Sequence, residues 1–319
     1  MTGPGRAGPR GVVEVLHPGA STLVQDRGRP GYAAIGVGRS GAADAGALRL
    51  ANRLVGNDPS AAGLEVLLGG IELRFTAPTV LALAGAEVPA ELDLPGSEPV
   101  PVGAQQAVRV PGGAVLRTGR AIRGLRLYLA VRGGVDVPPV LGSRASDQLS
   151  GLGPAPVRAG DELPVGRLGR DAAQPWPEPL RAWPGTAQAP GPAVLRVLPG
   201  PRPDWFVPDA LADLSAAVYR VTPASNRVAL RLDGPPVRRT DRGELPSEPL
   251  VPGAVQVPPD GRPVVFGADH PVTGGYPVLA VVLPSDLDLA AQLAPGAPVR
   301  LVPVGEPLVV LSARPGPSV

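Results

Sequence analysis

Residues 64–75, LEVLLGGIELRF, place two short, largely apolar segments on either side of a pair of glycines. Apolar and polar side chains alternate in IELRF at 71–75, and a period of two is typical of a strand with one buried face. The glycines at 69–70 end the first segment and set a turn before the second. This stretch therefore predicts two consecutive strands.

Strand-like segments of the same kind recur through both halves of the chain. In the first half they lie at 12–16, 79–85, 106–110, 114–118 and 125–131. Short strands separated by Gly and Pro pairs are typical of an antiparallel barrel or sandwich. We therefore predict a mainly β fold with a few short helices.

The division of the chain follows from its length and from one change in composition. A chain of 319 residues suggests two domains. Residues 168–193 contain many prolines and no apolar period, and strand-like segments resume at 194. We predict an N-terminal β domain at 12–167, a Pro-rich linker at 168–193 and a C-terminal β domain at 194–305.

Three helices are expected. Residues 40–59 place apolar side chains on one stripe, with Asp44 near the start as a cap and Pro59 after the end. A short helix is expected within 208–219. A last one is expected to begin at Ser285, with Asp288 three residues later in a capping-box-like arrangement.

The composition excludes several kinds of site. The chain contains no lysine, so it lacks the lysine of a P-loop, of a Schiff-base enzyme and of a biotin carrier. Cysteine is absent as well, which removes disulfides and thiolate chemistry. With only His17 and His270, a His-rich zinc site is not expected, and we predict no metal.

Charge and hydropathy predict a cytoplasmic protein. The first residues, MTGPGRAGPRG, contain no apolar core of a signal peptide. No apolar run approaches the ~20 residues that cross a bilayer, so no membrane partner is expected. The net charge is +2 and aromatics make up 3%, which argues against a nucleic-acid partner.

The first candidate cluster covers 24–32, VQDRGRPGY, and 36–44, GVGRSGAAD. Arg29 and Arg39 lie near glycines that let the backbone approach a ligand. Ser40 leads into a helix N-terminus, where free amides favour anions. These residues predict a site for a carboxylate or phosphate. The alternative is a Gly-rich turn and a capped helix with solvated arginines.

The second candidate cluster is VTPASNRVALRLDGP at 221–235. Asn226 and Arg227 precede a strand, and this pair can orient an amide or carboxylate by directed hydrogen bonds. The alternative is an Asx-type turn with an arginine at a strand edge.

The third candidate cluster lies in short strands and turns between residues 244 and 277 and could converge on one pocket mouth. Asp269 and His270 are adjacent, so on a strand they would point to opposite faces and could not pair as in a serine hydrolase. His270 alone fits either a structural histidine or a ligand-binding or proton-transfer group. The polar residues and glycines of this cluster that we assign to the site are Ser247, Glu248, Gln256, Asp269, His270, Thr273, Gly274, Gly275 and Tyr276.

Taken in order, segments of these clusters and of the strands between them resemble the biotin-dependent carboxyltransferase family. That family includes allophanate hydrolase subunit 2, an antagonist of a sporulation-kinase inhibitor, and the C-type subunit of prokaryotic 5-oxoprolinase. The resemblance runs from about residue 12 to about 305. It is carried by VQDRGRPGY, SGAAD with ALRLANRLVGN, LEVLLGG, YLAVRGGVDVPPVLGSRASD, VTPASNRVALRLDGP, ELPSEPLVPGAVQVPPDGRPVV and ADHPVTGGYPV.

The resemblance implies two tandem cyclophilin-like β-barrel domains and work in a complex. The implied partners are a smaller subunit of related fold, called allophanate hydrolase subunit 1, and a lactam-utilisation subunit. The implied activity is hydrolysis of a cyclic amide: ATP-dependent opening of 5-oxoproline to glutamate, with ATP handled by the complex, so that the chain can be inactive by itself. Biotin, where used, would arrive on a partner, because this chain has no lysine to carry it.

Within this family the candidate residues acquire expected roles. We assign Asp269, His270 and Gln256 as catalytic candidates, and the remaining cluster residues as substrate-binding. Arg39 stands where a less charged residue is expected, which leaves the substrate preference open. The set assigned to substrate binding is Arg29, Arg39, Ser40, Asn226, Arg227, Ser247, Glu248, Thr273, Gly274, Gly275 and Tyr276.

Three functions remain open from the sequence. The first is a 5-oxoprolinase subunit, and the second is a carboxyltransferase component that acts on urea or another amide. The third is a regulatory subunit that binds a partner without turnover.

Overall fold

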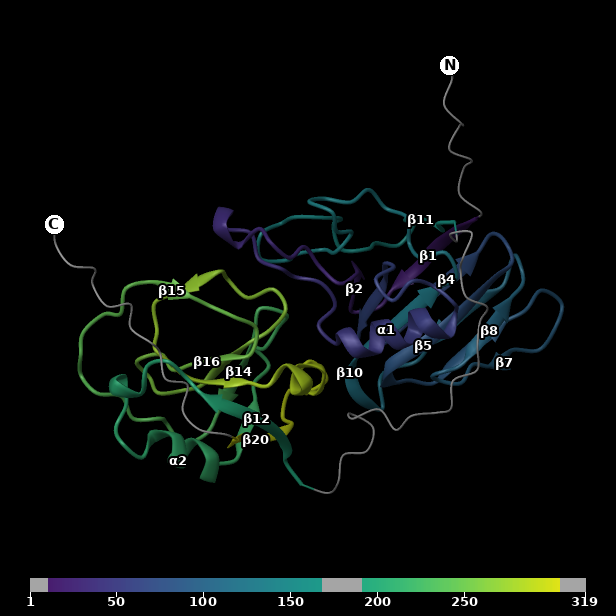
Figure 1. The fold of residues 1–319 in the computed structure, drawn as a ribbon. Coiled ribbons are helices and arrows are strands. Elements are labelled where there is room, and N and C mark those ends of the chain that lie inside the picture. The colour runs from purple at the N-terminus through teal and green to yellow at the C-terminus, as the bar shows by residue number, and fades with distance from the viewer. Residues whose placement is uncertain (1–10, 168–190, 305–319) are drawn as a thin grey trace, which may run out of the picture. The chain divides into compact units, whose positions relative to one another are not determined.

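The computed structural model describes residues 11–167 and 191–304, which form a mainly β structure in two compact units (Figure 1). Among the described residues, unit 1 contains 11–167 together with Ala268–His270 and Asp288–Ala294. Unit 2 contains 191–267, Pro271–Leu287 and 295–304. The predicted domain ranges stay predictions, since most of the predicted linker lies outside the described residues. They did not include the two segments that return to unit 1.

Unit 1 is built from two antiparallel sheets. The first is six-stranded, in the order β11-β1-β4-β9-β6-β7. The second is five-stranded, in the order β2-β3-β10-β5-β8. The strands are β1 Val12–Pro18, β2 Ser21–Gln25, β3 Gly63–Leu67, β4 Ile71–Phe75, β5 Thr79–Glu87, β6 Ala90–Asp93, β7 Val100–Pro101, β8 Ala107–Val110, β9 Val115–Thr118, β10 Arg123–Val131 and β11 Glu162–Pro164.

The opening stretch of the sequence connects these two sheets. LEVLL contributes β3 to the five-stranded sheet and IELRF is β4 of the six-stranded sheet, so the two strands do not pair with each other. Leu68, Gly69 and Gly70 between them all have positive φ, at 61°, 71° and 79°. Glycine adopts this region without the steric cost of a Cβ. The predicted turn therefore moves the chain from one sheet to the other.

One apolar core lies between the two sheets. Leu64 and Val66 of β3 pack in the same buried cluster as Leu73 and Phe75 of β4, and every one of these side chains is at most 1% exposed. Burial of side chains on alternate positions of β4 agrees with its predicted period.

Helix α1 (Ala45–Leu54) covers the outer face of the five-stranded sheet, where it packs against β5 and β10 (Figure 1). The predicted stripe is buried, with Ala47, Ala51 and Leu54 at 0% exposure. Asp44 is the N-cap, and its Oδ1 accepts a hydrogen bond from the Ala47 amide at 2.8 Å. Both features of this helix are as predicted.

Unit 2 contains a closed seven-stranded barrel in the order β12-β19-β16-β17-β14-β13-β20. Ala254 and Phe266 lie in its apolar core. A separate two-stranded sheet pairs β15 with β18. The strands are β12 Ala193–Pro199, β13 Tyr219–Val221, β14 Ala229–Asp233, β15 Glu248–Pro249, β16 Ala254–Gln256, β17 Val264–Phe266, β18 Thr273–Gly274, β19 Val278–Val282 and β20 Pro298–Pro303.

The prediction of two barrels is confirmed for unit 2, whereas the strands of unit 1 form two open sheets. The edge strands β7 and β11 of the six-stranded sheet end in Pro101 and Pro164. Proline cannot donate a backbone hydrogen bond, so it suits a sheet edge and opposes further pairing there.

The remaining helices are short. The one predicted within 208–219 is α2 (Ala210–Ala216), which packs on β20. The last predicted helix is a 3₁₀ turn at Pro284–Asp286 followed by α3 (Leu287–Ala290). Its capping box does not form, because Ser285 Oγ donates to Asp286 Oδ1 instead. Two further 3₁₀ turns lie at Ala33–Ile35 and Pro203–Trp205.

No helix within 11–167 or 191–304 has the length and apolar character needed to cross a membrane.

Candidate functional site

The predicted site residues divide between the two units. Unit 1 holds Arg29, Arg39, Ser40, Asp269 and His270. Unit 2 holds the others, including the catalytic candidate Gln256. The structure therefore gives two candidate clusters, and we describe each within its own unit.

In unit 1, Asp269 is held by residues that are far away in the sequence. Its side chain is buried, and Oδ1 accepts a 2.6 Å hydrogen bond from Ser40 Oγ. Oδ2 accepts from the Gln148 amide at 3.3 Å. Ser40 itself has a φ of 52°, a left-handed conformation that is uncommon for a residue with a Cβ and that concentrates at functional sites. The carboxylate of Asp269 is thus fixed in position before any ligand binds.

The carbonyl of Ser146 joins Ser40 to a second buried side chain. It accepts from Gln25 Nε2 at 2.8 Å and from Ser40 Oγ at 3.3 Å. We call Gln25, Arg29, Ser40, Ser146 and Asp269 the Asp269 cluster. Buried atoms of three of its members, Gln25 Oε1, Arg29 Nη1 and Ser146 Oγ, have no hydrogen-bond partner among the described residues. Buried polar atoms are nearly always hydrogen-bonded, so these atoms can bind water or a ligand.

Arg29 lies in the interior of unit 1 at 1% exposure. Its Nη2 donates to the Ala145 carbonyl, and its Nη1 lies 3.8 Å from Asp147 Oδ2. A guanidinium in this environment stabilises the loop that contains Ala145 and Asp147. Its predicted role in binding a substrate anion stays a prediction.

The other two unit 1 candidates differ in exposure. Arg39 is exposed, and its Nε donates to the Arg27 carbonyl at 3.4 Å. His270 is 6% exposed and follows the anchored Asp269 directly. The buried position of His270 agrees with the structural interpretation and does not test the proton-transfer role.

In unit 2, Gln256, Gly274 and Tyr276 come together as the sequence predicted. Gln256 is buried, and its Nε2 donates to the Tyr276 carbonyl at 2.8 Å. A Cβ at Gly274 would lie 2.7 Å from that same Nε2. Only glycine lets the β18 backbone approach the amide this closely. The Tyr276 side chain is 46% exposed, so its hydroxyl is available at the surface of the turn.

Glu248 lies opposite Gly274 in the two-stranded sheet. Its carboxylate binds both ends of the Arg202 guanidinium, with Arg202 Nε to Oε2 at 3.1 Å. This bidentate pair already satisfies the Glu248 carboxylate. The neighbouring candidates Ser247, Thr273 and Gly275 are exposed.

The second predicted cluster forms an Asx-type turn. Asn226 Oδ1 accepts from the Val228 amide at 2.9 Å and from the Ala229 amide at 3.2 Å. Arg227 beside it is 5% exposed. This geometry matches the structural alternative for Asn226, whose side chain caps its own strand.

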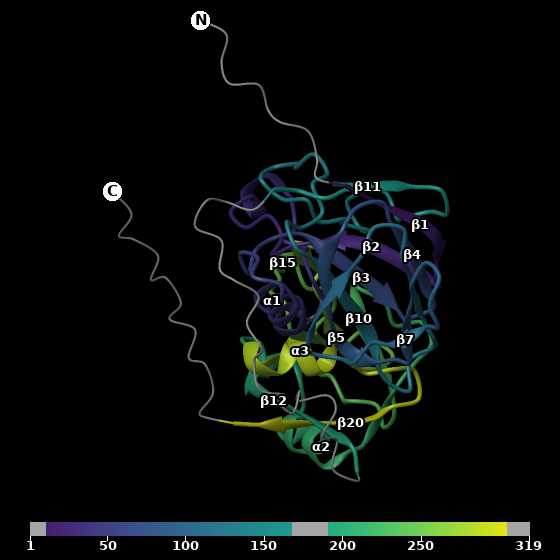
Figure 2. The same cartoon turned by 90° about the vertical axis from the view of Figure 1, so that its right-hand side faces the viewer.

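A second buried polar network, which we did not predict, surrounds the start of α1. Gln292, in one of the returning segments, donates from Nε2 to Asp44 Oδ2 at 2.9 Å, and its Oε1 accepts from the amides of Leu125 and Arg126. Asp288 accepts from the Gly46 amide at 3.1 Å, and Figure 2 shows α3 beside α1. Burial, with the nearby Asp288 carboxylate, raises the pKa of Asp44 to about 7.

Glu65 completes this network. It is 3% exposed, accepts from the Tyr128 hydroxyl at 2.7 Å, and lies 3.4 Å from Arg126 Nε. Burial raises the pKa of the Tyr128 hydroxyl well above its ordinary value.

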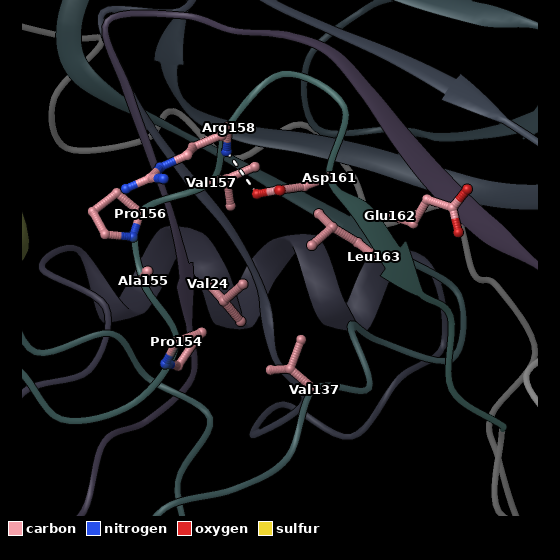
Figure 3. Close-up of a pocket in the computed structure, with 10 residues that line it drawn as sticks. All are labelled: Val24, Val137, Pro154, Ala155, Pro156, Val157, Arg158, Asp161, Glu162 and Leu163. Atoms are coloured by element: carbon pink, nitrogen blue, oxygen red, sulfur yellow. Dashed lines mark hydrogen bonds between the residues drawn. The ribbon is translucent and has the colours of Figure 1, made fainter.

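Unit 1 also contains an open pocket of about 370 Å³, which we call the Val24 pocket (Figure 3). None of the predicted site residues lines it. Its lining residues are Val24, Val137, Pro154, Ala155, Pro156, Val157, Arg158, Asp161, Glu162 and Leu163.

The residues that sequence reasoning missed are Gln25, Ser146, Glu65 and Gln292. Ser146 falls within the segment YLAVRGGVDVPPVLGSRASD that carries the family resemblance, so that segment was a signal for it. The others gave no local signal, since a buried glutamine or glutamate in a strand or helix pattern looks like a surface residue.

Comparison with known proteins places this mainly β chain in a defined class. It belongs to the family described as carboxyltransferase domain, subdomain A and B, whose model matches residues 35–303. The family resemblance seen in the sequence is thereby confirmed.

Among its relatives, the C-type subunit of 5-oxoprolinase from Escherichia coli is 36% identical over 294 residues, which is 91% of each chain. Urea amidolyase of Lachancea kluyveri is 34% identical over 313 residues, 91% of this chain but 17% of that protein. The crystal structure of the K. lactis urea amidolyase matches 94% of this chain and 19% of that one, with a TM-score of 0.83 at 30% identity. The chain therefore spans nearly all of the bacterial subunit and a small part of the amidolyases.

Proposed function

We propose that this chain is the C-type subunit of a complex that opens 5-oxoproline to glutamate with ATP. The observation that carries the proposal is the 36% identity with the C-type subunit of the E. coli 5-oxoprolinase across 91% of both chains. A match of this extent supports the same kind of subunit, because little of either chain is left over. The smaller related-fold subunit and the lactam-utilisation subunit are proposed partners.

Opening a lactam demands donors and fixed charges, because the amide is stabilised by resonance. Groups that are already oriented contribute most, since they need no reorganisation when charge develops. In unit 1 the Asp269 carboxylate is oriented by Ser40 Oγ and the Gln148 amide. We propose that it positions the substrate N–H or an attacking water. His270, the next residue, is the proposed proton-transfer group.

In unit 2 the Gln256 amide is the proposed orienting group. Its Nε2 is fixed on the Tyr276 carbonyl. The contact with Gly274 restricts the amide further. A glutamine held in this way can present Oε1 to a substrate N–H, and the exposed Tyr276 hydroxyl can donate to a carboxylate.

The residues of this chain do not fit an attached biotin or a P-loop nucleotide site, because the sequence contains no lysine. Within 11–167 and 191–304, no group of three or more His, Cys, Asp or Glu side chains is arranged to hold a metal ion. We therefore assign ATP handling to the partner subunits and derive no step through ATP or biotin.

A second candidate function is carboxyl transfer to urea or a similar amide. The structural match to the K. lactis urea amidolyase, with a TM-score of 0.83 over 94% of this chain, favours it. In that case biotin would be presented by another chain.

The deciding experiment measures glutamate formed from 5-oxoproline and ATP by the chain purified with its partner subunits. Each preparation compares wild type with Asp269→Asn, His270→Ala and Gln256→Ala. Gln106→Ala is the matched control, because Gln106 is exposed in unit 1 and outside both clusters. Thermal unfolding and gel filtration establish that each variant folds and assembles.

We expect ATP-dependent glutamate that requires this chain, and a loss of about 100-fold or more when a transition-state donor is removed. The Gln106→Ala complex should keep wild-type activity. An assembled complex that forms no glutamate contradicts the proposal. Carboxyl transfer from carboxybiotin to urea by the same complex would then support the second function.

A further inference from the structure

The Val24 pocket has an apolar floor that continues into the core of unit 1. Val24, Val157 and Leu163 belong to the buried cluster between the two sheets, at 1%, 6% and 6% exposure. Val137 packs against the same cluster. Its volume of about 370 Å³ falls within the ~300 to 1,000 Å³ of small-molecule sites.

The wall of the pocket is rigid. Pro154 and Pro156 fix their own backbone φ. The Val157 amide donates to the Thr22 carbonyl at 2.9 Å, and the Gly160 amide donates to the Val15 carbonyl at 2.8 Å. The segment that forms the wall is thus anchored on β1 and on the start of β2, so the pocket is preformed.

The mouth of the pocket carries three charged side chains whose positions follow from one turn. Arg158 to Asp161 close a β-turn, with the Asp161 amide on the Arg158 carbonyl at 3.1 Å. Asp161 Oδ2 accepts from the Arg158 amide at 2.7 Å, as Figure 3 shows. One Asp161 oxygen is thus bound to the Arg158 backbone, and no ion pair joins the Arg158 guanidinium to a carboxylate within the described residues.

This arrangement differs from that of other exposed arginines of unit 1. Arg74 pairs with Glu14 at 2.8 Å, and Arg144 pairs with Asp136 at 2.7 Å. Arg158 therefore keeps its donors for a ligand at the edge of an apolar pocket. A guanidinium there binds a carboxylate by two parallel hydrogen bonds.

Glu162 and Asp161 limit what that ligand can be. Figure 3 places the Glu162 carboxylate on the far side of the pocket from the Arg158 guanidinium. With one positive and two negative side chains, the mouth repels a simple anion. A molecule that also brings an N–H donor can satisfy both ends.

The pocket also adjoins the Asp269 cluster through the chain. Val24 precedes Gln25, and its carbonyl accepts from the Ser146 amide at 2.9 Å. Pro154 follows Gly153, whose Cβ position lies 3.2 Å from Arg29 Nη2. The buried polar atoms of Gln25, Arg29 and Ser146 that lack hydrogen-bond partners among the described residues therefore lie in the segments next to the pocket.

We propose that the Val24 pocket binds a small molecule with one carboxylate and one N–H donor on a compact apolar body. The carboxylate binds Arg158, the N–H faces the Glu162 side of the mouth, and the apolar body packs on Val24, Val157 and Leu163. 5-Oxoproline belongs to this class. Its use as a probe rests on the proposed function, whereas the class of ligand rests on the pocket alone.

The test is a titration of the full chain with valine methyl groups labelled for NMR, so that Val24, Val137 and Val157 report on the pocket. Three probes separate the contributions. 5-Oxoproline has all the features, 2-pyrrolidinone lacks the carboxylate, and cyclopentanecarboxylate lacks the N–H. We expect 5-oxoproline to shift the pocket methyls and to bind about tenfold more tightly than either analogue.

Two variants identify the contacts. Arg158→Gln is expected to weaken 5-oxoproline binding by about tenfold and to leave 2-pyrrolidinone binding unchanged. Arg109→Gln is the matched control, since Arg109 is an exposed arginine of β8 outside the pocket. Ala155→Trp places a large side chain on the exposed wall and should abolish the shifts produced by every probe.

Absence of shifts at these methyls, equal affinity for 5-oxoproline and 2-pyrrolidinone, or equal effects of Arg158→Gln and Arg109→Gln would each overturn the proposal. Its failure is distinct from failure of the proposed function. A complex that forms glutamate while the pocket stays empty overturns only the pocket. Binding by the chain alone with no glutamate from the complex overturns only the function.

Discussion

Replacing Asp44 with asparagine is expected to change the sign of its effect on stability between acid and alkaline pH. Burial, with the nearby Asp288 carboxylate, raises the pKa of Asp44 from 3.8 to about 7 in the folded chain. Between these two values the folded state keeps a proton that the unfolded chain has lost. The contribution of Asp44 to stability is therefore fully present below about pH 4 and is lost as pH rises to about 7.

The size of the effect follows from the shift. Each pKa unit corresponds to ~1.4 kcal/mol, so the shift of about three units removes about 4 kcal/mol from the unfolding free energy by about pH 8. Asparagine keeps the N-cap bond to the Ala47 amide, since it caps as well as aspartate. Its amide nitrogen would face Gln292 Nε2, another donor, which costs about 1 kcal/mol at every pH.

Asp44→Asn is thus expected to be about 1 kcal/mol less stable than wild type near pH 4 and about 3 kcal/mol more stable near pH 8. Amide hydrogen exchange of peptides from α1, corrected for the intrinsic rate at each pH, measures this locally. Asp58→Asn is the control, because Asp58 is exposed and hydrogen bonds to Ser60 lower its pKa. Parallel wild-type and Asp44→Asn profiles across this range would refute the reasoning.

Three other substitutions test the two clusters. Arg29→Met should lower the unfolding free energy by about 3 kcal/mol or more, since it leaves the buried Asp147 carboxylate without its cation; denaturant unfolding measures this, and a loss no larger than that of Arg109→Met would contradict it. Ser40→Ala should cost about 1 to 3 kcal/mol by removing a donor to buried Asp269, and should speed hydrogen exchange in the peptide that contains 268–270 while α1 is unaffected. Gly274→Ala should displace the Gln256 amide at a cost of about 1 to 3 kcal/mol, seen as a shifted Gln256 side-chain NMR signal; an unchanged signal would show that β18 moves instead.

Local patterns in the sequence were sufficient to predict the elements that depend on neighbouring residues. The stripe of α1 and its Asp44 cap follow from spacing alone, because a helix brings residues three and four apart onto one face. Strands such as β4 followed from alternation for the same reason. The Asx turn at Asn226 was one of two interpretations that the sequence left open.

Strand pairing was less predictable. LEVLLGGIELRF predicted two strands and a turn, yet these strands join different sheets. Alternation specifies which side chains are buried but not which strand lies next to another. The open sheets of unit 1 and the closed barrel of unit 2 therefore could not be told apart from their patterns.

What the sequence by itself determined is the class of protein, the mainly β fold, the first helix and the chemistry that a chain without lysine or cysteine cannot perform. Only the tertiary structure decided which polar groups meet. Ser40 binds Asp269 across 229 positions, and Asp44 binds Gln292 across 248. Such contacts leave no periodic trace, because the two partners are brought together by strand order and by chain segments that return to unit 1, and neither is encoded in local spacing.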